Sequence, residues 1–218
     1  YTVFNQGSVA THTQLPAAST DAVGARWAAG LNDIKAMYDA GCFPVNTLTA
    51  GDADTFQLMT DDKAAFAIDG SWKIGYFQEN AQDINNFTVT YVPGKGARKS
   101  TDLIGGLSMG YYITRKAWDD PAKREAAVKF VEAMTTDEVV STFGATAVTA
   151  LKNGTAAPAD ADALVQAALV MTKGATGIAA ATEDGLSSEA RSALFADVKN
   201  VVTGKTTPEQ AIDACLAL

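Results

Sequence analysis

The sequence predicts a helix-rich α/β fold, and three features of the residue pattern support that prediction. Apolar residues recur at helical spacing through most of the chain, and short apolar or alternating runs typical of strands lie between the helical segments. Glycine or proline marks the ends of both kinds of segment. The strand-like runs are unevenly distributed, so a complete doubly wound sheet is not expected, and the sheet needs strands from elsewhere in sequence.

The chain before residue 115 is predicted to mix helices with strands. The expected elements are, in order, helices over 21–40 and 52–60, a strand over 65–68, a helix over 71–79 that Ser71 caps, and strands over 87–92 and 107–114. The first helix places apolar and aromatic residues on one face, which predicts a buried stripe of Val23, Trp27, Leu31, Ile34 and Tyr38. Thr20 or Asp21 is placed to cap its start, and Gly41 suits the position after its end.

Beyond residue 115 the chain is predicted to be helical. The expected helices cover 121–134, 136–144, 161–173, 188–203 and 207–218, and a linker rich in Ala, Thr, Pro and Asp covers 146–160. Asp120 followed by Pro121 is typical of a helix start, and Thr207 with Gln210 forms a capping box. The helix that follows Asp120 is predicted to bury a stripe of Ala127, Phe130, Val131 and Met134.

The charge balance limits the classes of partner. A net charge of −8 argues against nucleic acid, whose phosphates demand clustered Lys and Arg. Lys95, Arg98 and Lys99 form the only tight basic group, and their Gly-flanked position predicts a solvated loop. No run approaches the ~20 apolar residues that a membrane-spanning helix needs. The first residues show neither an initiator Met nor a signal peptide, so either an export signal has been removed or the chain starts within a longer protein, and the family resemblance described below favours the second.

Few residues suggest catalysis or metal binding, and neither a cofactor nor a metal is predicted. His12 is the only histidine and has no Ser or Cys motif near it, so a catalytic triad or a His-based metal site is not expected. The carboxylate pairs Asp61-Asp62 and Asp119-Asp120 sit at helix ends, where capping explains them. A carboxylate-pair glycoside hydrolase is nevertheless the strongest enzyme alternative. Cys42 and Cys215 are expected to be two small buried thiols rather than a disulfide.

Several stretches of the chain resemble one family in their order and spacing. They are KAAFAIDGSW at 63–72, IGGLSMGYYIT at 104–114, DPAKREAAVKFVEAMTTDE at 120–138 and DVKNVVTGKTTPEQAIDA at 197–214. Together they resemble the bacterial extracellular solute-binding proteins of sugar importers, the family that includes maltose-binding protein. The resemblance covers roughly the whole chain, as the latter part of a full-length family member.

The resemblance implies a periplasmic-binding-protein-like fold of type II, in which two α/β lobes close on a ligand held between them. On that pattern residues 1–107 belong to the C-terminal lobe, 108–150 return to the N-terminal lobe and 151–218 complete the C-terminal lobe. Hinge crossings are expected near 104–108 and 150–158. Most of the N-terminal lobe, and with it half of the expected ligand contacts, lies outside this sequence.

The candidate ligand contact that carries most weight is Trp72. An indole can bury the apolar C–H face of a sugar ring, whose hydroxyls then need nearby donors and acceptors. Gly70 and Ser71 place Trp72 at the start of a helix, where free backbone N–H groups can bond ligand oxygens. The alternative is that Trp72 packs in the core beneath that helix.

Four further residues complete the predicted ligand site. Gly105 and Gly106 either allow the backbone to approach the ligand at a hinge crossing or mark a bend in a strand. Arg191 occupies the place where family members often carry a second aromatic, and Asp184 lies in the loop before it. Arg191 could clamp hydroxyls or a carboxylate, although solvated surface is the alternative for both side chains.

The implied function is to bind a mono- or oligosaccharide and deliver it to the permease subunits of an ABC importer. We therefore expect an extracellular or periplasmic monomer, with membrane contact only through a lipid anchor outside this chain. Other interpretations are a glycoside hydrolase fragment, a binding protein for a polyol, an amine or a metal chelate, and a helical adaptor that contacts only proteins.

Overall fold

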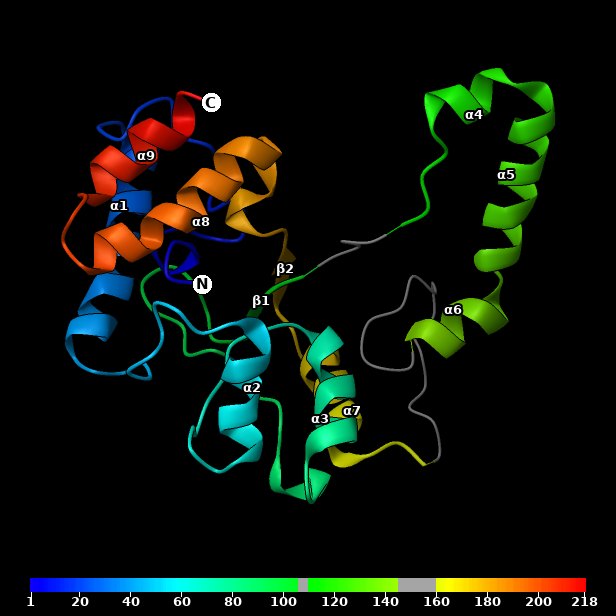
Figure 1. Ribbon diagram of the computed structural model, residues 1–218, viewed down its shortest axis with the longest axis horizontal. Helices are drawn as coiled ribbons and strands as arrows, with labels where there is room; N and C mark the ends of the chain where they lie inside the picture. Colours follow the sequence, from blue (N-terminus) through cyan, green and yellow to red (C-terminus); the bar gives the residue numbers. More distant parts are fainter. Residues whose placement is uncertain (106–109, 145–159) are drawn as a thin grey trace. The chain divides into compact units, whose positions relative to one another are not determined.

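The computed structural model describes residues 1–105, 110–144 and 160–218 (Figure 1). The chain divides into two compact units, each built from segments that are distant in sequence. The first unit comprises Tyr1–Thr55, Tyr91–Gly106 and Ala175–Leu218, and the second comprises Phe56–Thr90 and Leu107–Gly174. The expected linker over 146–160 lies outside the described residues except for Asp160.

Most of the described elements are helices, as the sequence predicts. Those of the first unit are η1 (Phe4–Gln6), α1 (Ala22–Asp39), β1 (Asp102–Ile104), β2 (Gly177–Ala179), η4 (Thr182–Gly185), α8 (Ser188–Val202) and α9 (Pro208–Leu216). Those of the second are η2 (Ser71–Lys73), α3 (Ile74–Asn80), η3 (Ile84–Asn86), α4 (Arg115–Asp119), α5 (Pro121–Met134), α6 (Asp137–Gly144) and α7 (Ala163–Lys173). Helix α2 (Asp52–Thr60) begins in the first unit and ends in the second.

Three helices, α1, α8 and α9, lie side by side and enclose the core of the first unit (Figure 1). Asp21 caps α1 as expected, because its Oδ1 accepts hydrogen bonds from the N–H groups of Val23 at 2.8 Å and Gly24 at 2.7 Å. The buried cluster consists of Trp27, Ala28, Leu31, Ala190, Leu194, Val201, Ala211, Ile212 and Cys215. The helix starts predicted at Asp120-Pro121 and at the Thr207 capping box are confirmed as well.

The sheet within the described residues is smaller than expected and lies elsewhere in sequence. Strand β1 pairs in parallel with β2, with Leu103 opposite Ile178. The strands predicted over 65–68 and 87–92 are wrong, and the described part of 107–114, residues 110–114, forms no strand either. These segments alternate as strands do, but a strand also needs a neighbour to supply its ladder hydrogen bonds, and the described residues supply none to them.

The second unit has its own core, formed mainly by α3 and α7. Ile74 packs among a group of buried side chains contributed by α7, namely Leu164, Val165, Ala168 and Leu169. Phe77 extends the core through a ring contact with Phe87, at 4.9 Å between centroids. The buried stripe predicted for α5 is wrong, because no residue of α5 is buried and Phe130 is 55% exposed.

Two polar residues of the first unit, Arg98 and His12, are buried, and for Arg98 this contradicts the expected solvated loop. Arg98, predicted to be solvated, is 3% exposed, and its guanidinium donates to Asn5 Oδ1 at 2.7 Å and to the Asp102 carbonyl at 3.1 Å. These acceptors satisfy the guanidinium, which allows its burial. His12 is 2% exposed. Across 1–105, 110–144 and 160–218, no helix combines the length and apolar character that a bilayer crossing requires.

Candidate functional site

The indole of Trp72 is presented to solvent on a short turn of the second unit. Trp72 lies in η2, and its side chain is 70% exposed, so the interpretation that it packs in the core is wrong. The turn is closed by a hydrogen bond from Lys73 N–H to the Gly70 carbonyl at 3.0 Å. Ser71 does not cap the following helix as predicted, because η2 intervenes and α3 has no side-chain cap.

The residues around Trp72 fix the turn from both sides. The Asp69 carboxylate accepts a hydrogen bond from Gly70 N–H at 2.7 Å. On the other side, Lys73 Nζ lies 4.5 Å from the centroid of the buried Phe56 ring, a cation–π contact that ties the turn to α2. Trp72 is thus an exposed aromatic ring on an anchored backbone.

A second predicted pair, Asp184 and Arg191, is brought together in the first unit. Arg191 Nη1 lies 3.8 Å from Asp184 Oδ1, and both side chains are half exposed. Asp184 in turn accepts a hydrogen bond from Ala181 N–H at 3.2 Å, which holds the carboxylate on η4. The pair presents both donors and an acceptor to solvent, a combination that suits hydroxyl groups.

Phe195 joins this pair and was missed by sequence reasoning. The Arg191 guanidinium lies 5.6 Å from the centroid of the Phe195 ring, which is 50% exposed. Residues four apart on a helix share a face, so the spacing of Arg191 and Phe195 on α8 was the signal that could have revealed it. An exposed aromatic therefore stands one turn after the position at which the family resemblance suggested one.

The predicted glycine pair is described only in part. Gly105 extends the small sheet, because its N–H donates to the Ala179 carbonyl at 2.9 Å. A β-carbon added at Gly105 would lie 3.2 Å from the Ile178 side chain. Gly106 lies outside the described residues. A role for either glycine at a hinge or a ligand stays a prediction.

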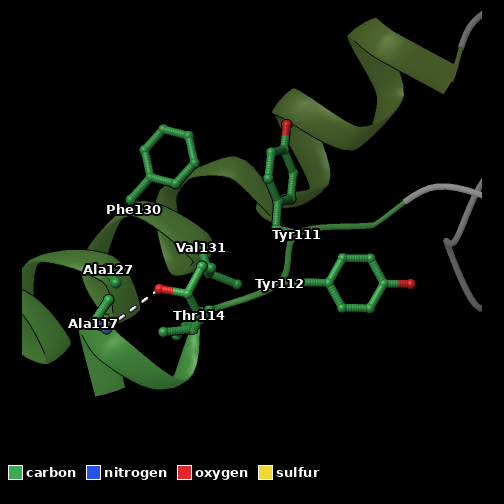
Figure 2. Close-up of a pocket in the computed structure, with 8 residues that line it drawn as sticks. Tyr111, Tyr112, Thr114, Ala117, Ala127, Phe130 and Val131 are labelled. Atoms are coloured by element: carbon green, nitrogen blue, oxygen red, sulfur yellow. Dashed lines mark hydrogen bonds between the residues drawn. The ribbon is translucent and has the colours of Figure 1, made fainter. Parts of the chain in front are cut away.

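An aromatic groove runs between the segment 110–114 and the helices α4 and α5 (Figure 2). Its lining consists of Tyr111, Tyr112, Ile113, Thr114, Ala117, Ala127, Phe130 and Val131. Tyr111 meets Phe130 edge-on at 5.6 Å between ring centroids, and Figure 2 shows the Tyr112 ring projecting away from the helices. Both tyrosines are exposed, Tyr111 at 47% and Tyr112 at 87%.

A second groove lies in the first unit beside the end of α1. Cys42 and Met37 line it together with the ion pair Asp33–Lys95, in which Lys95 Nζ lies 3.2 Å from Asp33 Oδ1. Cys42 is exposed and unpaired with Cys215, so the expectation that both thiols are buried holds only for Cys215. Salt-bridged charges at a surface carry little free energy, and this groove shows no anchored aromatic.

Asp120, from one of the carboxylate pairs found in the sequence, caps a helix. Asp120 accepts hydrogen bonds from Ala122 N–H and Lys123 N–H, and its carboxylate lies 2.8 Å from Lys123 Nζ. Lys123 holds the pKa of Asp120 below its usual value, which suits a cap and not a general acid. Within the described part of the chain, no three His, Cys, Asp or Glu side chains are grouped as metal ligands.

A family model described as bacterial extracellular solute-binding protein matches residues 3–147, well over half of the chain. The chain belongs to this family. Among solved structures, the solute-binding protein is similar to a chitin oligosaccharide binding protein, with a TM-score of 0.76 and 16% sequence identity. The likeness covers 99% of this chain and 54% of that chain. No curated protein sequence matches.

These comparisons confirm the predicted fold class. The solute-binding protein has the fold expected from its resemblance to sugar-importer proteins, although it spans only about half the length of the similar structure. At 16% identity the likeness concerns the fold alone. The structure assigns Trp72 to the second unit and Gly105, Asp184 and Arg191 to the first.

Proposed function

We propose that this solute-binding protein binds a small carbohydrate and delivers it to the permease of an ABC importer. The observation that carries the proposal is the Trp72 indole, which is exposed on an anchored turn of a protein whose family binds solutes. Single exposed apolar side chains are common, but a ring held on an anchored turn offers a fixed flat surface for a ligand to stack on. The apolar face of a sugar ring matches it in shape and size.

Asp184 and Arg191, in the first unit, are candidate polar contacts for a sugar. A sugar hydroxyl both donates and accepts hydrogen bonds, and this pair offers a carboxylate beside a guanidinium. Asp184 accepts a hydrogen bond from Ala181 N–H and Arg191 lies over the Phe195 ring, so each side chain has a partner in place before the ligand arrives. The chitin oligosaccharide binding protein of similar fold makes chitin oligosaccharides the first ligands to test.

Delivery to a permease follows from the same proposal. A binding protein that closes on its ligand presents a different surface when loaded, and a membrane partner can select that closed form. The hinge crossings expected near 104–108 and 150–158 fall mostly outside the described residues, so a hinge there stays a prediction. We place the protein outside the cytoplasmic membrane, and the description of its family as extracellular supports this. The protein acts by binding and release, without turnover of the sugar.

A thermal-shift screen of the purified native protein tests the proposal. Chitin oligosaccharides, maltodextrins, monosaccharides, polyols and amines are each added over a range of concentrations. A true ligand at a hundred times its dissociation constant stabilises the protein by about 2.7 kcal/mol, which raises Tm by several degrees. If no carbohydrate shifts Tm but a polyol or an amine does, the protein belongs to a different class of solute receptor. Release of shortened sugars would show a hydrolase.

A further inference from the structure

We propose that Gly70 is a positioning residue for Trp72. The Trp72 indole packs against the Cα of Gly70, a contact called the seat below, and a single ring face is left open to ligand. This inference rests on the proposed function of Trp72 and assigns Gly70 a different role from the ligand contact expected at first. Gly70 acts on the sugar through Trp72.

The backbone at Gly70 does not explain why glycine stands there. Its φ of −107° and ψ of 170° lie in the extended region that every residue adopts without strain. Glycine is needed where φ is positive or where another group approaches the backbone closely, and only the second reason is available here.

The space beside Gly70 is filled by Trp72. A methyl group built on Gly70 would overlap Cη2, Cζ3 and Cε3, all of which belong to the six-membered ring of the indole. The ring therefore rests against the bare Cα of Gly70. The backbone there is fixed by the Asp69 carboxylate on its N–H and by Lys73 N–H on its carbonyl.

The seat has two consequences for binding. It restricts the rotation of the indole before ligand arrives, which reduces the entropy lost on association. It also covers one face of the six-membered ring while the side chain as a whole stays 70% exposed. One sugar ring can then stack on the outer face, and a second ring cannot sandwich the indole from beneath.

A double-mutant cycle on the native protein tests the seat, with chitin oligosaccharides as the probe and calorimetry as the readout. Gly70→Ala displaces the indole and should weaken binding about two- to tenfold, the range that an off-rotamer side chain implies. In the Trp72→Ala background the same change should have no effect, because no ring is left to displace. Gly75→Ala is the matched control, since a methyl group there meets nothing within 4 Å.

A fluorescence measurement tests the seat without any ligand. In a Trp118→Phe background, Trp72 is the only exposed tryptophan, because Trp27 is 3% exposed. Gly70→Ala should raise acrylamide quenching of Trp72, and Gly75→Ala should leave it unchanged. If Gly70→Ala alters neither quenching nor affinity, the seat is wrong. If it raises quenching while Trp72→Ala leaves sugar affinity intact, the seat stands and the proposed function fails.

Discussion

His12 shows how one buried side chain joins distant parts of the first unit. Its ring stacks on Phe4 with 3.9 Å between centroids, and its Nε2 lies 3.0 Å from the Ala180 carbonyl oxygen, just after β2. A carbonyl only accepts, so Nε2 carries the hydrogen. Nδ1 is buried without a partner among the described residues. The neutral imidazole fits this place, and a charged one would not.

The stability of the first unit should therefore fall in mild acid. Burial lowers the pKa of His12 below its usual value, and the nearby positive charge of Arg26 lowers it further. Because the unfolded chain takes up this proton more readily than the folded one, the contribution is complete above about pH 6.5 and is lost as pH falls through the folded pKa. Thermal unfolding should show Tm decreasing between about pH 7 and pH 5.

His12→Gln supplies the control for this pH dependence, because the amide keeps a donor for the Ala180 carbonyl but does not titrate in this range. Its Tm should change less between the same pH values than that of the native protein. The pKa of Asp21 is lowered chiefly by the Gly24 N–H. Its titration at lower pH therefore does not contribute to the difference in Tm between the native protein and His12→Gln. Equal pH dependence in both proteins would rule out His12 as the source.

At the scale of elements, the sequence identifies helices well and their burial less well. Asp21 and the stripe through Trp27 and Leu31 specify both α1 and the face it buries, since its partners α8 and α9 are in the same chain. Helix α5 has an equally clear start at Asp120 and an equally clear apolar stripe, yet none of its residues is buried. A residue pattern indicates which face of a helix is apolar, but it does not indicate which other part of the protein covers that face.

In the candidate site too, some residues could be predicted from the sequence, and others are recognised only from their contacts in the structure. Trp72 could be singled out because glycine and serine before an aromatic at a helix start suggest a presented ring, and the structure does expose it. Phe195 was missed because many aromatic residues lie on predicted helices. It becomes a candidate site residue only through its contact with the Arg191 guanidinium. The burial of Arg98 was missed because its acceptors, Asn5 and the Asp102 carbonyl, are remote or unrecognisable in sequence.

The aromatic groove of α4 and α5 leads to a prediction about its cover. We propose that the part of the solute-binding fold with no counterpart in this chain packs on Tyr112 and Phe130, as expected if 108–150 return to the N-terminal lobe. Tyr112→Ser with Phe130→Ser should then destabilise the native protein by about 2–4 kcal/mol, the loss of two buried rings. Urea unfolding measures this change.

Val170→Ser is the control for the groove, since Val170 is apolar and 71% exposed on α7. It should change the free energy of unfolding by less than about 0.5 kcal/mol. Light scattering on the same variants distinguishes the occupants of the groove. If the double substitution turns a dimer into a monomer, a second copy covers the aromatic face. If neither mass nor stability changes, the face is open to solvent.

At the scale of the whole molecule, the chain joins two units through segments that pass between them several times. Such passages suit a receptor that opens and closes, because a few crossing residues can absorb the change in backbone angles. Under the proposed function, these passages serve the capture of a solute. A ring anchored on a short turn, as Trp72 is, can move with its unit without losing its orientation.

The most direct test of the account is a calorimetric titration of chitin oligosaccharides into the native protein, the Trp72→Ala variant and the Trp118→Ala variant. Trp118 is the matched control, because its indole is also exposed, at 46%, but lies on α4 under Arg124. The account predicts that Trp72→Ala weakens binding at least about tenfold and that Trp118→Ala leaves it within about twofold of the native value. Equal affinities in all three proteins would contradict it.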